Sequence, residues 1–237
     1  MALRAEPNAE QPLGPRMVEL TLAACDLAQA AWKHAVAGLT SNAADQFDAT
    51  DLCELELDQL DRQLDEELAA ALGMAKSSEQ RELLSCLKLM TDLERIGDLA
   101  ATFAGRGRAV GRHLDAEDVR ELAEMGQRVA RMLEGVRQAY AARDLMLAVT
   151  VLRADAEVDR LRNLLFHRHI HGQESGEVRE SIQVLFMTQA LERAGDHAKN
   201  LAEEVCHLIS GHTLRHVLRS NGKSREQMLL DWLKRQQ

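Results

Sequence analysis

Hydrophobic residues recur along most of the chain at alternating spacings of three and four, the pattern of helices that bury one face. Two such seams consist of Cys86, Leu89, Leu93, Ile96, Ala100 and Phe103, and of Val184, Met187, Leu191, Ala194, Ala198 and Leu201. Polar breaks near residues 38–42, 73–78, 105–115, 141–144 and 172–176 divide the body into six predicted helices of about 20 to 35 residues. Short connections between long helices predict antiparallel neighbours.

One motif occurs twice. LERIGD at residues 93–98 returns as LERAGD at 191–196, 98 residues later, and the acidic stretch 54–60 resembles 155–161 at an offset of 101. The sequence therefore predicts an all-α fold of two tandem three-helix bundles. We place a disordered tail at 1–15, the first unit at 16–112, the second at 113–216, and a C-terminal tail with a short amphipathic helix at 217–237.

Composition supports helices and narrows the class of partner. All three prolines lie within the first fifteen residues, so the strongest helix breaker is missing from the rest of the chain. The net charge of −9 repels phosphate backbones and anionic lipid, and aromatic residues, at 3%, are too few for base stacking. We therefore expect no nucleic acid partner, and contact with a membrane only through other proteins. Trp32 and Trp232 are expected to be packing residues.

The cysteines bear on the compartment. They lie inside helical patterns without C-x-x-C spacing, which favours buried, reduced thiols over disulfides or zinc. The four are Cys25, Cys53, Cys86 and Cys206. No stretch approaches 18 uncharged apolar residues, and the N-terminal residues show no secretion signal. These features predict a cytoplasmic protein.

Four predicted helices each carry two acidic residues four positions apart, one residue after a seam position and so about 100° round the helix. The pairs are Glu54 and Asp58, Glu94 and Asp98, Asp155 and Asp159, and Glu192 and Asp196. If the second and third helices of each unit are neighbours, their acidic flanks meet in one groove per unit. Like charges at this spacing destabilise a helix by about 0.2–0.5 kcal/mol per pair, so a cation is expected there.

Two interpretations of these pairs remain open. Carboxylates favour hard cations such as Mg²⁺, Mn²⁺, Ca²⁺ or iron over zinc, which makes the groove a candidate metal site. Alternatively the acids face water, some of them paired with Arg95 and Arg193. Gly97 and Gly195 lie within the same helices, where glycine costs about 1 kcal/mol relative to alanine. Their equal place in both repeats predicts close helix approach beside the groove.

Weaker patterns suggest other sites. His167 and His171 have metal-ligand spacing, with His169 between them, yet their place at a helix end favours surface histidines. Glu204 and His207 give one Glu-x-x-His, whereas di-metal oxidases need this motif on two helices. No nucleotide-binding or acyl-transfer motif is present, and we predict that the protein is not an enzyme.

The string LERAGDHAKNLAEEV at 191–205, followed by glycine at 211 and Arg-His at 215–216, closely resembles the end of PhoU proteins. Those proteins carry L-E-R-x-x-D-H-A-x-N-I-A-E and then G-x-x-x-R-H. LERIGDLA at 93–100 resembles the matching motif of their first unit, and the likeness spans about residues 16–216. The resemblance implies a fold of two three-helix bundles.

The resemblance also implies metal clusters at the two E-x-x-x-D motifs, which are the third-helix acidic pairs of both units. Mg, Mn, Fe and Zn are the candidate ions. At the second motif His197 and Asn200 match the family pattern, whereas the first has Leu99 and Thr102, so metal is expected more at the second. Arg95, Arg193, His197 and Asn200 are expected to flank the metal or to face a partner.

For function, the resemblance implies negative control of phosphate uptake and of the phosphate-starvation response. Proteins of the family act as adaptors between the ATPase subunit of a phosphate ABC transporter and a membrane sensor histidine kinase. We expect the same partners here, and a homodimer. Two other functions remain open: a metal-binding regulator of another transporter, and a di-metal carboxylate storage or redox protein.

Overall fold

The structure is a computed structural model that describes residues 13–171 and 178–211. Those residues form α1 (Leu13–Ser41), α2 (Ala44–Met74), α3 (Ser77–Val110), α4 (Ala116–Ala142), α5 (Leu145–His171) and α6 (Val178–Ser210), with a short 3-10 turn, η1 (Gly111–His113), after α3. The described ranges contain no strand, which confirms the all-α prediction. Most of the predicted N-terminal tail, and all of the predicted C-terminal amphipathic helix, lie outside the described residues.

The ends of the helices follow local sequence signals. Pro15 lies in the first turn of α1, where its missing N–H breaks no helical bond, so the helix begins three residues earlier than predicted. Asp115 caps α4 by accepting a hydrogen bond from the Glu117 amide at 3.0 Å. The predicted break from Gly105 onwards is too early, because α3 continues to Val110. One glycine does not end a helix whose flanking residues still pack.

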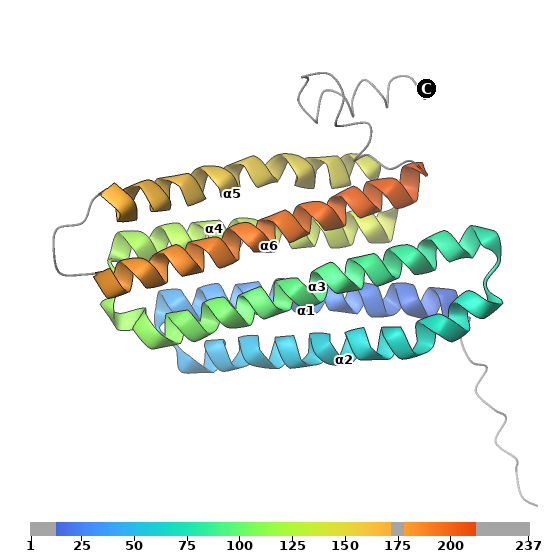
Figure 1. The fold of residues 1–237 in the computed structure, drawn as a ribbon, viewed down its shortest axis with the longest axis horizontal. Coiled ribbons are helices and arrows are strands. Elements are labelled where there is room, and N and C mark those ends of the chain that lie inside the picture. The colour runs from blue at the N-terminus through green and yellow to red at the C-terminus, as the bar shows by residue number, and fades with distance from the viewer. Residues whose placement is uncertain (1–12, 172–177, 212–237) are drawn as a thin grey trace, which may run out of the picture.

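Helix packing produces two three-helix bundles side by side. In the first, α1 contacts α2 and α3, and α2 contacts α3; in the second, α4 contacts α5 and α6, and α5 contacts α6. The units meet through equivalent helices, α1 against α4 and α3 against α6. In Figure 1 the six helices run roughly along one direction, with α2 and α5 at opposite edges. The tandem-repeat prediction is therefore confirmed.

A single hydrophobic core runs through both units and takes buried residues from all six helices. Trp32 is fully buried and packs edge-on against Phe103, with ring centroids 5.5 Å apart, as a packing residue should. All four cysteines are free, and only Cys53 is not fully buried. Burial raises the pKa of the Cys25 and Cys206 thiols to about 12, which keeps both protonated and unreactive.

Candidate functional site

Five acids form a first acidic cluster where α2 packs against α3. Its members are Glu54, Asp58, Asp61, Glu94 and Asp98. Partial burial is the largest cause of a raised pKa at Glu54 and at Glu94. The charge of Asp98 adds to both shifts, and that of Asp58 adds to both as well. The acids of α2 and α3 therefore lie within range of one another's charge, and Asp61, which the sequence pattern did not single out, belongs to the same cluster.

Close packing of α2 and α3 makes this meeting possible. A Cβ atom on Gly97 would lie 2.7 Å from Cδ1 of Leu57, a distance that real contacts do not reach. In the second unit, a Cβ atom on Gly195 would lie 3.1 Å from Cγ1 of Val158. Both glycines are buried and face equivalent residues of the repeat. The predicted close helix approach is confirmed in both units.

Cations offset little of the charge in the first acidic cluster. Arg62 Nη2 lies 3.5 Å from Asp58 Oδ2, at the outer limit of a hydrogen bond, and its side chain is 69% exposed. Arg95 is exposed. Its charge lowers the pKa of Glu94, but burial and the neighbouring acids raise that pKa by more. An exposed pair of this kind contributes about 0–1 kcal/mol, so the cluster remains a region of carboxylate repulsion.

A second acidic cluster lies between α5 and α6 and consists of Asp155, Asp159, Glu192 and Asp196. Burial and the charge of Asp155 raise the pKa of Asp159, and burial and the charge of Asp196 raise that of Glu192. Unlike the first cluster, this one contains a cation of its own. Lys199 of α6 donates through Nζ to Oδ2 of Asp155, which is only 5% exposed. The ammonium group already neutralises one of the four carboxylates.

The remaining predicted residues, Arg193, His197 and Asn200, all lie on α6. His197 Nδ1 lies 2.8 Å from Asp92 Oδ1 of α3, so this ring joins the two units. Arg193 is exposed, and Asn200 is half-buried one turn beyond Asp196. The preference for metal at the second motif rested on His197 and Asn200. That preference stays a prediction: in this structure His197 contacts Asp92, and Lys199 already contacts Asp155.

Neither cluster is arranged around an ion. Within residues 13–171 and 178–211, no three His, Cys, Asp or Glu side chains are gathered in a way that could hold a metal. A metal site therefore stays a prediction that requires the carboxylates to turn towards one another. The donor chemistry of the first cluster fits a hard cation, because all five members offer oxygen and none of them carries an ammonium or guanidinium partner closer than 3.5 Å among the described residues.

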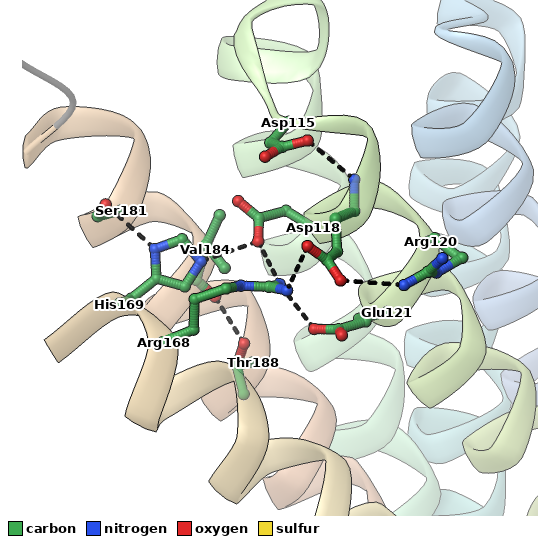
Figure 2. Close-up of polar contacts among 10 residues, drawn as sticks. Asp115, Asp118, Arg120, Glu121, Arg168, His169, Ser181, Val184 and Thr188 are labelled. Atoms are coloured by element: carbon green, nitrogen blue, oxygen red, sulfur yellow. Dashed lines mark hydrogen bonds and ion pairs between the residues drawn. The ribbon is translucent and has the colours of Figure 1, made fainter. Parts of the chain in front are cut away.

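A further polar site, which was not predicted from the sequence, lies near the start of α4. Arg168 Nη2 donates to Asp118 Oδ1 at 2.5 Å and to Glu121 Oε2 at 2.6 Å, and both acids are 7% exposed. Nε2 of His169 is 2.9 Å from the same Asp118 oxygen, and its Nδ1 is 3.1 Å from Ser181 Oγ. Figure 2 shows Arg168 and His169 converging on Asp118 from α5. The network ties α5 and α6 to α4.

The repeat shows how unusual this network is. At the repeat offsets of 101 and 98 residues, His169 corresponds to Leu68 and Ser181 to Leu83, both buried apolar residues of the first unit. Comparison of the two repeats was the signal that could have revealed the network. The prediction of surface histidines is wrong for His169, because its side chain is only 10% exposed and is hydrogen-bonded on both nitrogens.

The single Glu-x-x-His also has a structural explanation. Glu204 accepts hydrogen bonds from Ser85 Oγ at 2.7 Å and from Lys88 Nζ at 3.1 Å, which ties α6 to α3. A carboxylate with these two partners joins helices of different units. It gives no support to a di-metal centre.

Fold and sites together define a class: an all-helical protein of two repeated three-helix units, each with one carboxylate cluster between its second and third helices. The PhoU domain model matches residues 16–106 and 122–205, so the chain belongs to the PhoU family. None of the described helices is long and apolar enough to cross a membrane.

Relatives with assigned names agree with this membership. A "phosphate-specific transport system accessory protein PhoU homolog" of Pseudomonas aeruginosa is 32% identical over 172 residues, which are 68% of this chain and 69% of that protein. A homologue of the same name from Zymomonas mobilis is 35% identical over 137 residues, or 57% and 58% of the two chains.

Solved structures extend the likeness to the whole fold. The crystal structure of PhoU from Pseudomonas aeruginosa matches with a TM-score of 0.79 at 26% identity, covering 84% of this chain and 97% of that one. The PhoU structure from Streptococcus pneumoniae, at 21% identity and a TM-score of 0.74, shares the fold.

Proposed function

We propose that this protein is an accessory regulator of a phosphate transport system. The observation that carries the proposal is the match to the Pseudomonas aeruginosa PhoU structure, which extends over 97% of that chain at 26% identity. A likeness of this extent includes both repeats. The regulatory role, in place of an enzymatic one, comes with the family.

In its finer form, the proposal is negative regulation of phosphate uptake and of the phosphate-starvation response. The protein acts in the cytoplasm, as a homodimer, between the ATPase subunit of a phosphate ABC transporter and a sensor histidine kinase. The net charge of −9 and the low aromatic content support protein partners over nucleic acid. A regulator of another transporter is the competing function, which the names of the relatives disfavour.

Metal binding is part of the proposal, and the first acidic cluster is its better site. Glu54 and Asp58 of α2 with Glu94 and Asp98 of α3 would hold a divalent or iron cation, which would neutralise acids that now repel one another. In the second acidic cluster a cation would have to compete with Lys199 for Asp155. A storage or redox protein is disfavoured, because Glu204 is already engaged with Ser85 and Lys88.

Gene deletion tests this function directly. In the native host, the strain that lacks the gene should express a phosphate-starvation reporter at high phosphate, and the wild-type gene should silence the reporter again. The E94Q/D98N variant should fail to silence it, whereas D45N/E56Q, which neutralises two exposed acids elsewhere on α2, should succeed. A reporter that stays silent in the deletion strain at high phosphate would contradict the proposed function.

A further inference from the structure

A hollow of about 1,090 Å³ lies at one end of the first unit, between the start of α1, the end of α2 and the start of α3. Val18, Ala71, Met74 and Leu83 give it apolar walls. Met74 is 71% exposed, an unusual amount for a large apolar residue that lines a concavity. Pockets that take ligands in proteins measure about 300–1,000 Å³, so the hollow has room for several bulky side chains.

Acidic residues surround these apolar walls. Glu19, Glu66 and Glu79 line the hollow, are exposed, and form no ion pair within the described part of the chain. Glu67 is paired through Oε1 with Arg16, yet its Oε2 atom is buried and accepts no hydrogen bond from any described group. A buried carboxylate oxygen without a donor is a costly feature that an incoming basic group would relieve. The hollow is therefore suited to an apolar segment with positive charges.

The chain itself supplies a segment of this chemistry. Residues 212–237 contain Arg215, Arg219, Lys223, Arg225, Lys234 and Arg235 against Glu226 and Asp231. The last fourteen residues also include Met228, Leu229, Leu230, Trp232 and Leu233, with capping-box spacing at Ser224 and Gln227. The first twelve residues of the chain match the charge of the hollow poorly, because they carry Arg4 against Glu6 and Glu10.

The segment starts at the same end of the first unit as the hollow, on another side of α3. A Cβ atom on Gly211, the residue after α6, would lie 3.1 Å from Arg81 Nη1 of α3. Arg81 is two residues, about 200° round the helix, from Glu79 and Leu83, which line the hollow, so the chain has to pass round α3 to reach it. Figure 1 shows the end of α6 and the α2–α3 connection at the same end of the molecule. Twelve residues, 212–223, span up to about 40 Å when extended, well beyond the roughly 10–12 Å width of one helix.

We propose that residues 224–237 dock in this hollow of their own chain, with their apolar side chains against Met74 and their basic side chains against Glu19, Glu66 and Glu67. The contact covers the apolar walls of the hollow. It also withholds a basic, apolar segment that could otherwise bind an anionic lipid surface. The C-terminal segment then acts as a built-in occupant that a competing partner has to displace.

Trp232 reports on the contact in the full-length protein, because Trp32 is fully buried and contributes a constant background. Acrylamide quenching of wild type, corrected with the W232F variant, should show Trp232 quenched several-fold less than N-acetyltryptophanamide. The E19K/E66K variant should raise the quenching of Trp232 towards the free value, whereas D45K/E56K, with the same charge change outside the hollow, should leave it unchanged. Adding K234E/R235E to E19K/E66K should restore the shielding by exchanging the charges.

Several outcomes would overturn the proposal. In wild type, Trp232 quenched as freely as the amide would show that the segment does not dock. Shielding that survives E19K/E66K would place the segment elsewhere. Shielding that is lost on dilution would show that a second copy supplies it. Shielding that arises only with vesicles of anionic lipid would identify a membrane as the occupant.

Discussion

Gly97 of α3 lies directly against Leu57 of α2, so close that a Cβ atom on the glycine would come within 2.7 Å of Leu57 Cδ1. The contact stands one residue away from Asp58 on α2 and from Asp98 on α3. Since α2 and α3 can approach only as far as this contact allows, Gly97 sets how near the two acidic flanks come to each other. Gly195 and Val158 hold the same relationship in the second unit.

Enlarging Gly97 should therefore separate the helices. We expect G97V to lower the free energy of unfolding by about 1–3 kcal/mol, because overpacking displaces Leu57 and α2 with it. The matched control is G105V, since a Cβ atom on Gly105 of the same helix meets nothing within 4 Å, and this variant should be neutral or slightly stabilising. Urea titrations of both variants measure the difference, and equal effects would show that the Leu57 contact does not limit helix approach.

Removing charge from the first acidic cluster should stabilise the metal-free protein. We expect E54Q/E94Q to raise the free energy of unfolding in EDTA by about 0.5–1 kcal/mol, because unfavourable carboxylate pairings are relieved. The same variant should lose most of the stabilisation that Mg²⁺ or Mn²⁺ gives to wild type, since a ligand stabilises only the state that binds it. Melting curves at fixed ionic strength test both effects. Equal cation responses in the two proteins would reject this cluster as a cation site.

Mild acid should also stabilise the metal-free protein. The pKa values of Glu54, Glu94 and Asp98 are raised in the folded state by burial and neighbouring charge, so folded protein binds protons at a pH where the unfolded chain has released them. These groups therefore favour folding more as the pH falls from neutral through their folded pKa values, and the gain disappears as the pH rises through those values. Urea midpoints in EDTA should show a smaller gain for E54Q/E94Q than for wild type.

In the second acidic cluster, Lys199 should act as the resident cation. We expect K199M to destabilise the metal-free protein, because Asp155, 5% exposed, loses its ion-pair partner and keeps its charge in a buried position. Added Mg²⁺ or Mn²⁺ should then stabilise K199M more than wild type, since the competing ammonium is gone. Calorimetric titration with Mn²⁺ measures the affinities. Unchanged Mn²⁺ affinity in K199M would show that Lys199 does not compete with metal.

Among the ion pairs in the described part of the chain, those of Arg168 with Asp118 and Glu121 should contribute most to the free energy of unfolding. We expect R168M to lower the free energy of unfolding by about 2 kcal/mol or more, because Asp118 and Glu121 would both remain charged and nearly buried. The matched control is R160M on the same helix, whose ion pair with Glu157 is about half exposed on both sides and should contribute under 1 kcal/mol. Similar losses in the two variants would mean that burial adds nothing here.

Much of the architecture was predictable because it is a matter of local pattern. The three-four spacing of apolar residues located six helices, and the second copy of one motif gave the repeat. The same spacing put each acidic pair on one flank of its helix, since a single residue step turns the side chain by about 100°. Gly97 and Gly195 stood out because glycine lowers the stability of a helix, and a close neighbouring side chain is a reason to accept that cost.

Only the tertiary structure decided which charges meet. Lys199 reaches Asp155 across 44 residues, and His169 meets Asp118 across 51. Such contacts depend on the rotation and sliding of packed helices, which no single helical pattern specifies. Arg168 and His169 look like ordinary polar residues at a helix end in the sequence, and the packing of α5 and α6 on α4 makes them buried partners of Asp118. Sequence determines which face each helix buries, because burial of apolar surface is local and additive. The identity of polar neighbours follows from how whole helices fit together.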